Sequence, residues 1–148
     1  MAITEVALTP THPERRTLLC GGPPSDADLA RAKALGARAV LDLRPATEGS
    51  ASHDAARAIG AGLKALRIEV AGPAGLTPEN VRAFAEAIDD PAHSPLLVHC
   101  ASGNRVGALA ALKAGWVDGL APDAALELGR TAGLTKLEPA VRTALGLT

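Results

Sequence analysis

The most constraining feature of the sequence is a continuous apolar run at residues 96–98, which leads directly into a glycine-containing loop and a mostly apolar helical segment. A strand without alternating polar residues is typical of the buried parallel strands of α/β proteins. A helix that is hydrophobic nearly all round, expected over 105–114, must be buried too. The centre of the domain is therefore predicted to be a strand, a loop and a helix that meet at residues 99–105.

The rest of the chain alternates short strand patterns with helical ones, which predicts an α/β fold: a central, mostly parallel sheet flanked by helices. Further strands are expected at 16–20, 39–43 and 66–70, and further helices at 25–35, 52–59, from 77 onward, 122–131 and 137–145. The 148 residues are interpreted as a single domain, with an extended N-terminal segment at 1–16 and C-terminal helices at 117–148. Trp116, one of two aromatic residues, is expected to fill the core.

Composition excludes several classes of function. The net charge is −1 and the pI about 6.4, which argues against a nucleic-acid partner and against a polybasic membrane anchor. No apolar run approaches the roughly 18 residues that a membrane span needs, and residues 1–16 do not resemble a signal peptide. Two cysteines cannot form a disulfide framework, so we expect a cytoplasmic protein with reduced thiols.

The residues with the clearest chemistry are Cys100 and Arg105, at the two ends of the loop. A loop of this kind points backbone N–H groups inward, and the helix that follows adds the positive end of its dipole. We therefore expect Cys100 to be a thiolate nucleophile and Arg105 to clamp a bound oxyanion with its planar fork of donors. The intervening residues are predicted to form the anion-binding loop: Ala101, Ser102, Gly103 and Asn104.

The motif His-Cys-x-Ser-Gly-x-Arg at residues 99–105 resembles the signature of the bacterial DUF442 group, or beta-lactamase-hydrolase-like phosphatases. The similarity extends to the Gly-Pro-Pro-Ser segment at 22–25, the Leu-Arg-Pro segment at 43–45 with Glu48, and the helix start at 76–79. This resemblance implies the fold of cysteine-dependent dual-specificity phosphatases. It also implies that His99 supports the loop and does not act as the base.

Three departures from phosphatases keep alternatives open. Only four residues separate Cys100 from Arg105, which is similar to the spacing of rhodanese sulfurtransferases. Val106 stands where phosphatases usually have Ser or Thr, and the segment 71–76 contains no Asp or Glu to act as general acid. The alternatives are therefore a sulfurtransferase with a persulfide on Cys100, or an anion-binding regulatory module without turnover.

Other residues are candidates for supporting roles. Asp42 and Arg44 lie at the carboxyl end of a strand pattern, at the same sheet edge as Cys100. Asp42 could brace Arg105, or Arg44 could widen the anion site. The favoured alternative is an ion pair, either between the two or between Arg44 and Glu48. His53 and Asp54 could replace the missing acid, but a solvated surface pair is favoured. Cys20 is expected to pack in the core, with the alternative that it resolves an oxidised Cys100.

The sequence thus predicts a cysteine-dependent hydrolase of phosphate monoesters that works through a thiophosphate on Cys100. Its substrate would be phosphorylated or carry another oxyanion. No cofactor is expected, and no spacing of histidines and cysteines indicates a metal site. The sequence predicts neither the identity of the substrate nor the oligomeric state.

Overall fold

The computed structural model describes residues 4–7, 17–93 and 95–147. Its sheet has five strands in the order β1-β2-β5-β3-β4. All neighbouring strands are parallel except β1 and β2, which are antiparallel. The strands are β1 (Thr4–Ala7), β2 (Thr17–Gly21), β3 (Ala39–Asp42), β4 (Lys64–Arg67) and β5 (Leu96–His99). This confirms the predicted α/β fold with a mostly parallel central sheet.

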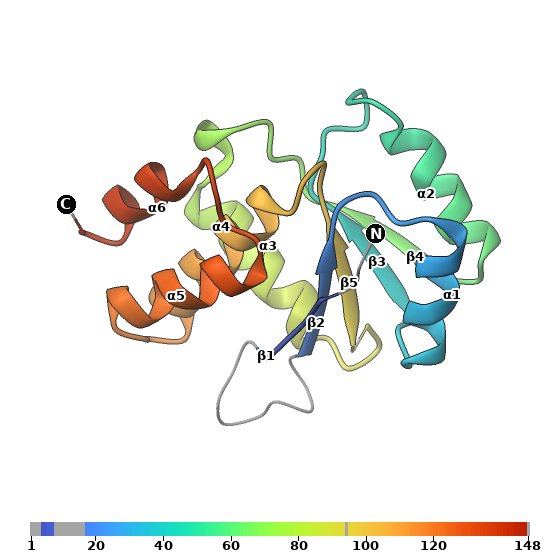
Figure 1. The fold of residues 1–148 in the computed structure, drawn as a ribbon, viewed down its shortest axis with the longest axis horizontal. Helices are drawn as coiled ribbons and strands as arrows, with labels where there is room; N and C mark the ends of the chain where they lie inside the picture. The colour runs from blue at the N-terminus through green and yellow to red at the C-terminus, as the bar shows by residue number, and fades with distance from the viewer. Residues whose placement is uncertain (1–3, 8–16, 94, 148) are drawn as a thin grey trace.

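Helices cover both faces of the sheet (Figure 1). The α-helices are α1 (Asp26–Ala34), α2 (Ala51–Gly60), α3 (Pro78–Asp89), α4 (Asn104–Leu112), α5 (Pro122–Ala132) and α6 (Glu138–Ala144). A 3-10 helix, η2 (Pro73–Gly75), precedes α3, and a π-helix, η3 (Lys113–Val117), continues α4. No helix among the described residues is long and apolar enough to cross a membrane.

Local chemistry explains where the helices begin. The Ser25 side chain accepts from the Asp28 N–H while Asp28 accepts from the Ser25 N–H, so α1 starts at the expected capping box. Thr77 caps α3 in the same way through the Asn80 N–H, and Pro78 stands at the first helical position as expected.

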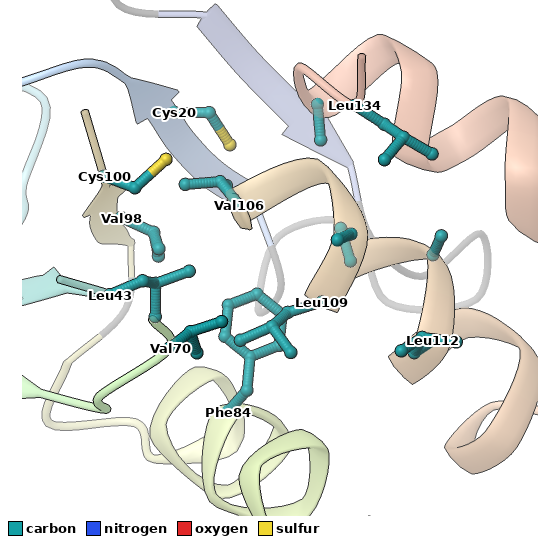
Figure 2. Packing of buried hydrophobic residues seen from close by; sticks show 14 of the residues in the cluster. Cys20, Leu43, Val70, Phe84, Val98, Cys100, Val106, Leu109, Leu112 and Leu134 are labelled. Atoms are coloured by element: carbon teal, nitrogen blue, oxygen red, sulfur yellow. The ribbon is translucent and has the colours of Figure 1, made fainter. Parts of the chain in front are cut away.

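Two hydrophobic clusters lie on opposite faces of the sheet, because successive strand residues point to opposite sides. On β5, Leu96 and Val98 belong to the larger cluster, which α3, α4 and α5 cover, whereas Leu97 belongs to the smaller one under α1 and α2. Figure 2 shows part of the larger cluster, with Phe84 at its base and Cys100 at its rim.

The structure corrects two expectations about the elements and adds one strand. Of the N-terminal segment expected at 1–16, only Thr4–Ala7 lies within the described residues, and it forms an edge strand. The strand expected at 66–70 is instead β4, because the chain leaves the regular ladder after Arg67. Trp116 is 40% exposed, since the π-helix η3 turns its ring outward to donate to the Ala144 carbonyl at 3.3 Å. The C-terminal helices α5 and α6 pack against α4 and thereby complete the larger cluster.

Candidate active site

Cys100 directly follows β5 at the edge where the parallel strands end (Figure 1). It is 0% exposed, and its Sγ accepts a hydrogen bond from the Gly103 N–H at 3.1 Å. On the other side Sγ faces apolar side chains, including Val106 (Figure 2). A hydrogen bond from an amide to sulfur stabilises negative charge there, as a thiolate nucleophile requires.

The loop 100–103 ends at Gly103, whose φ of 90° lies in the left-handed region that favours glycine. The N-terminus of α4 then begins without a side-chain cap. The first N–H groups of a helix have no partner within the helix, so these groups are available to an anion. Ala101 and Ser102 are exposed at the tip of the loop.

The side chain of Asn104 fixes the position of the loop. Its Oδ1 accepts hydrogen bonds from the N–H groups of Thr135 and Leu137 at 2.9 and 3.1 Å. The loop is thereby attached to the connection between α5 and α6. Gly133 packs so closely against Gly103 that a Cβ at residue 133 would lie 2.8 Å from the Gly103 carbonyl oxygen.

The guanidinium of Arg105 forms a bidentate ion pair with Glu48. Nη1 donates to Oε1 at 2.9 Å and Nη2 donates to Oε2 at 2.6 Å, while Nη1 also donates to the Val70 carbonyl at 2.8 Å. These hydrogen bonds hold the pKa of Glu48 below its ordinary value and raise that of Arg105. Glu48 is thus a fixed anion.

Counting donors shows what Arg105 still offers. A guanidinium has five N–H groups, and Glu48 and Val70 accept from both hydrogens of Nη1 and one of Nη2. The Nε–H and the second Nη2–H remain, and the thiolate of Cys100 contributes to the raised pKa of Arg105. One edge of the fork is therefore held by Glu48 while the other can bind two oxygens of a phosphate beside the sulfur.

The expectation that Asp42 braces Arg105 is wrong, because alternation along β3 places Asp42 on the other face. Leu41 and Leu43 point into the cluster that contains Cys100, and Asp42 therefore points toward α2. There the Asp42 carboxylate accepts from Arg44 Nε and Nη2, at distances down to 2.7 Å.

The prediction of an internal ion pair is thus confirmed, and the pair extends further than expected. Arg44 Nη2 also donates to Asp54 Oδ2 at 2.9 Å, and Arg57 pairs with Asp54 on its exposed side. Burial would raise the pKa values of Asp42 and Asp54, but the hydrogen bonds to their partners leave both below the ordinary value. Arg44 is therefore committed to these carboxylates and does not widen the anion site.

Asp54 also corrects the interpretation of the His53–Asp54 pair, because Asp54 is buried rather than solvated. Its carboxylate is occupied by Ser50, Arg44 and Arg57, so it is not placed to act as a general acid. His53 is exposed on α2.

His99 is 2% exposed and lies on the same face as Asp42. Burial lowers the pKa of His99, and the Asp42 carboxylate, 3.9 Å from Nε2, opposes this shift only in part. A neutral imidazole behind the loop fits the supporting role that the resemblance implies.

Cys20 lies on β2, which pairs directly with β5, and belongs to the same cluster as Cys100 (Figure 2). Burial, followed by the negative charge of Cys100, raises the pKa of Cys20 to about 12. Cys20 is thus a buried neutral thiol, as the core-packing prediction requires.

The contact of Glu48 with Arg105 was missed. Glu48 belongs to the segment that carries the resemblance and was a possible partner of Arg44, whereas the structure pairs it with Arg105. Glu48 lies 57 positions before Arg105, so no local pattern connects them. The one available signal was its place beyond the carboxyl end of a parallel strand, where sites of α/β folds form.

The segment 71–76, which includes η2, has no acidic side chain. Val70, just before it, contributes a backbone carbonyl to Arg105. The loop that follows β4 therefore orients the anion clamp, and its own residues after Val70 bring no proton donor of the carboxyl type.

Comparison with known proteins places this geometry in a family. A model of the family described as "DSP-PTPase phosphatase fused to NAD+ Kinase" matches residues 5–132. A search of curated proteins gives no match.

Solved structures agree on the fold. A DUF442 protein from Shewanella putrefaciens is 22% identical with a TM-score of 0.63, covering 98% of this chain and 93% of its own. TpbA from P. aeruginosa, in complex with phosphotyrosine, is 20% identical with a TM-score of 0.58, covering 97% and 96%. The catalytic core of a PP-IP phosphatase from S. cerevisiae, in complex with citrate, is 20% identical with a TM-score of 0.59, covering 82% and 76%.

The rhodanese-like alternative finds no support in these comparisons, despite the short spacing between Cys100 and Arg105. The predicted resemblance to DUF442 proteins and dual-specificity phosphatases is confirmed. The chain belongs to the family described as "DSP-PTPase phosphatase fused to NAD+ Kinase".

Proposed function

We propose that the protein hydrolyses phosphate monoesters with Cys100 as nucleophile and Arg105 as anion clamp. The observation that carries the proposal concerns the two edges of the Arg105 guanidinium. Glu48 and Val70 accept from one edge, and Cys100 also interacts with the guanidinium, through its charge and a side-chain hydrogen bond that raise the pKa of Arg105. This arrangement orients the clamp before substrate arrives, which is how preorganised donors lower a barrier.

In the first step the Cys100 thiolate attacks phosphorus, the S–P bond forms and the P–O bond of the ester breaks. The loop N–H groups and Arg105 stabilise the negative charge on the equatorial oxygens. In the second step water attacks the thiophosphate, the S–P bond breaks, and inorganic phosphate leaves with the thiolate restored.

The leaving group takes its proton from water in this scheme. Glu48 cannot supply it, because both of its oxygens hold Arg105 and its pKa is lowered. General acid catalysis typically contributes about 10²–10⁴-fold, so esters with acidic leaving groups are favoured.

The free thiols of Cys20 and Cys100 support a reducing compartment such as the cytoplasm.

The test compares nitrophenyl phosphate with a phosphotyrosine peptide, following released inorganic phosphate. We expect turnover of nitrophenyl phosphate, much slower turnover of the peptide, and a pH–rate profile without a falling limb at high pH. Cys100→Ser should abolish both reactions while phosphate still binds, as measured by calorimetry. Phosphate binding by the unmodified protein without any turnover would overturn the proposal and leave an anion-binding module.

A further inference from the structure

Arg67, the last residue of β4, contacts both ends of the segment that carries Glu48. Its Nη1 donates to the Arg44 carbonyl at 2.6 Å, and its Nη2 donates to the Ala51 carbonyl at 3.3 Å. Nη1 also lies 3.4 Å from Oδ2 of Asp42. Asp42 is the residue opposite Arg67 in the register of β3 and β4. Residues 44–51 are called the Glu48 loop below.

The Glu48 loop is also anchored near its ends, where Arg44 pairs with Asp42 and Asp54 and Ser50 Oγ donates to Asp54 Oδ2 at 2.7 Å. The middle of the loop, which carries Glu48, is held mainly by turns of the backbone. A turn bond joins the Glu48 N–H to the Pro45 carbonyl at 3.0 Å, and Ser52 Oγ donates to the Ala46 carbonyl at 2.9 Å. The Glu48 side chain is 36% exposed. An exposed ion pair is weak unless its partners are held in place, so the bidentate geometry with Arg105 depends on what anchors the loop.

We infer that Arg67 is a positioning residue for the phosphatase reaction: by holding both ends of the Glu48 loop, it sets Glu48 against Arg105 and so aims the free donors of Arg105 at the substrate. This inference rests on the proposed function. Arg67 touches neither Cys100 nor Arg105, and it acts through the loop. A guanidinium donates to two separate carbonyls from two nitrogens in a fixed plane, whereas an ammonium group has one nitrogen on a flexible stem and holds such a pair less well.

Arg57 is a matched control. Its side chain is 24% exposed against 20% for Arg67, and like Arg67 it donates to a backbone carbonyl, that of Pro24. Its other partners are Asp26 and Asp54. Asp54 also accepts from Arg44 and Ser50 of the Glu48 loop, and these hydrogen bonds remain when Arg57 is replaced. Replacing Arg57 therefore removes the same charge and comparable contacts without removing a direct contact to that loop.

The experiment measures kcat and KM for nitrophenyl phosphate in Arg67→Met, Glu48→Ala, the double variant and Arg57→Met, with urea unfolding of each. Residues that act as one unit couple by energies that correspond to about 2- to 150-fold. We expect Arg67→Met to lower kcat/KM about tenfold, and the double variant to match Glu48→Ala alone. Arg57→Met should lose similar stability with kcat/KM within twofold of the unmodified protein.

Arg67→Lys keeps a positive charge and covers the case in which Arg67→Met does not fold; we expect a loss of kcat/KM of about threefold. Losses that multiply in the double variant, or an equal loss in Arg57→Met, would overturn the inference. If the unmodified protein shows no turnover, the proposed function fails, but phosphate affinity measured by calorimetry still compares the same variants. Unchanged phosphate affinity in Arg67→Met and Arg67→Lys would then overturn the role of Arg67 separately.

Discussion

The guanidinium of Arg105 holds Glu48 with one edge and keeps the donors of its other edge for an anion, whereas a lysine can reproduce only its charge. In Arg105→Lys, a single ammonium group would have to bind both Glu48 and the substrate. We expect kcat/KM for nitrophenyl phosphate to fall by about 10²–10³-fold, the usual loss for one oxyanion donor. Urea unfolding of the same variant checks that the fold persists. A rate within twofold of the unmodified protein would show that Arg105 is not the clamp.

Cys20 and Cys100 provide a second test at the scale of single residues. Only a thiolate is alkylated, and the pKa of about 12 keeps Cys20 protonated at neutral pH. Iodoacetamide at pH 7, followed by peptide mass spectrometry, should modify Cys100 and spare Cys20. In urea, which exposes both, each should react. Equal labelling in the folded protein would contradict the assignment of Cys100 as the nucleophile.

Among the helices, the packing of α4 against α5 fixes the position of the helix that follows the active-site loop. A Cβ on Gly107 of α4 would lie 2.1 Å from the Leu134 N and 2.6 Å from the Gly129 carbonyl oxygen. These are backbone atoms, which cannot move aside as a flexible side chain can. The two helices are therefore this close because residue 107 has no side chain.

We expect Gly107→Ala to lower the free energy of unfolding by about 3 kcal/mol, since overpacking outweighs the gain in helix propensity. Gly60→Ala in α2 is the control, because nothing lies within 4 Å of its added Cβ. There we expect a change between zero and a gain of about 1 kcal/mol. Urea unfolding measures both, and an equal effect at the two sites would contradict the close-packing argument.

At the scale of the whole molecule, the two faces of the sheet have separate tasks. One face holds the apolar cluster under Cys100, and the other holds the buried carboxylates of Asp42 and Asp54 with Arg44 between them. At the carboxyl edge of the sheet, Arg67 and the Glu48 loop connect the face that holds the charged network with the face that holds Cys100. The charged network thus supports the active site from the side opposite to the nucleophile.

This network should make stability depend on acid pH. The folded pKa values of Asp42 and Asp54 are lowered, so their contribution is complete above the unfolded value of about 3.9 and is lost as pH falls below it. Asp42→Asn should cost about 3–5 kcal/mol at pH 7, the usual cost of breaking a buried ion pair. The difference from the unmodified protein should shrink in urea unfolding as the pH falls below about 4. A difference that stays constant would contradict the linkage.

Local patterns in the sequence determined much of this protein. The apolar run at 96–98, the capping box at Ser25 and the proline after Thr77 each act over a few residues, so they predicted strands and helices. The loop from Cys100 to Arg105 is also local, and its chemistry follows from a strand, a glycine and a helix N-terminus in sequence.

The side chains that meet across the sheet depend on long-range packing. Alternation along β3 turned Asp42 away from Arg105, and a loop distant in sequence brought Glu48 to the same guanidinium. Trp116 lies in the π-helix η3 and is 40% exposed, although a large aromatic side chain was expected in the core. Hydrophobic periodicity specifies the elements because each residue contributes through its immediate neighbours. The partners of Arg105 and Arg67 depend on strand order and register, which are properties of the assembled sheet.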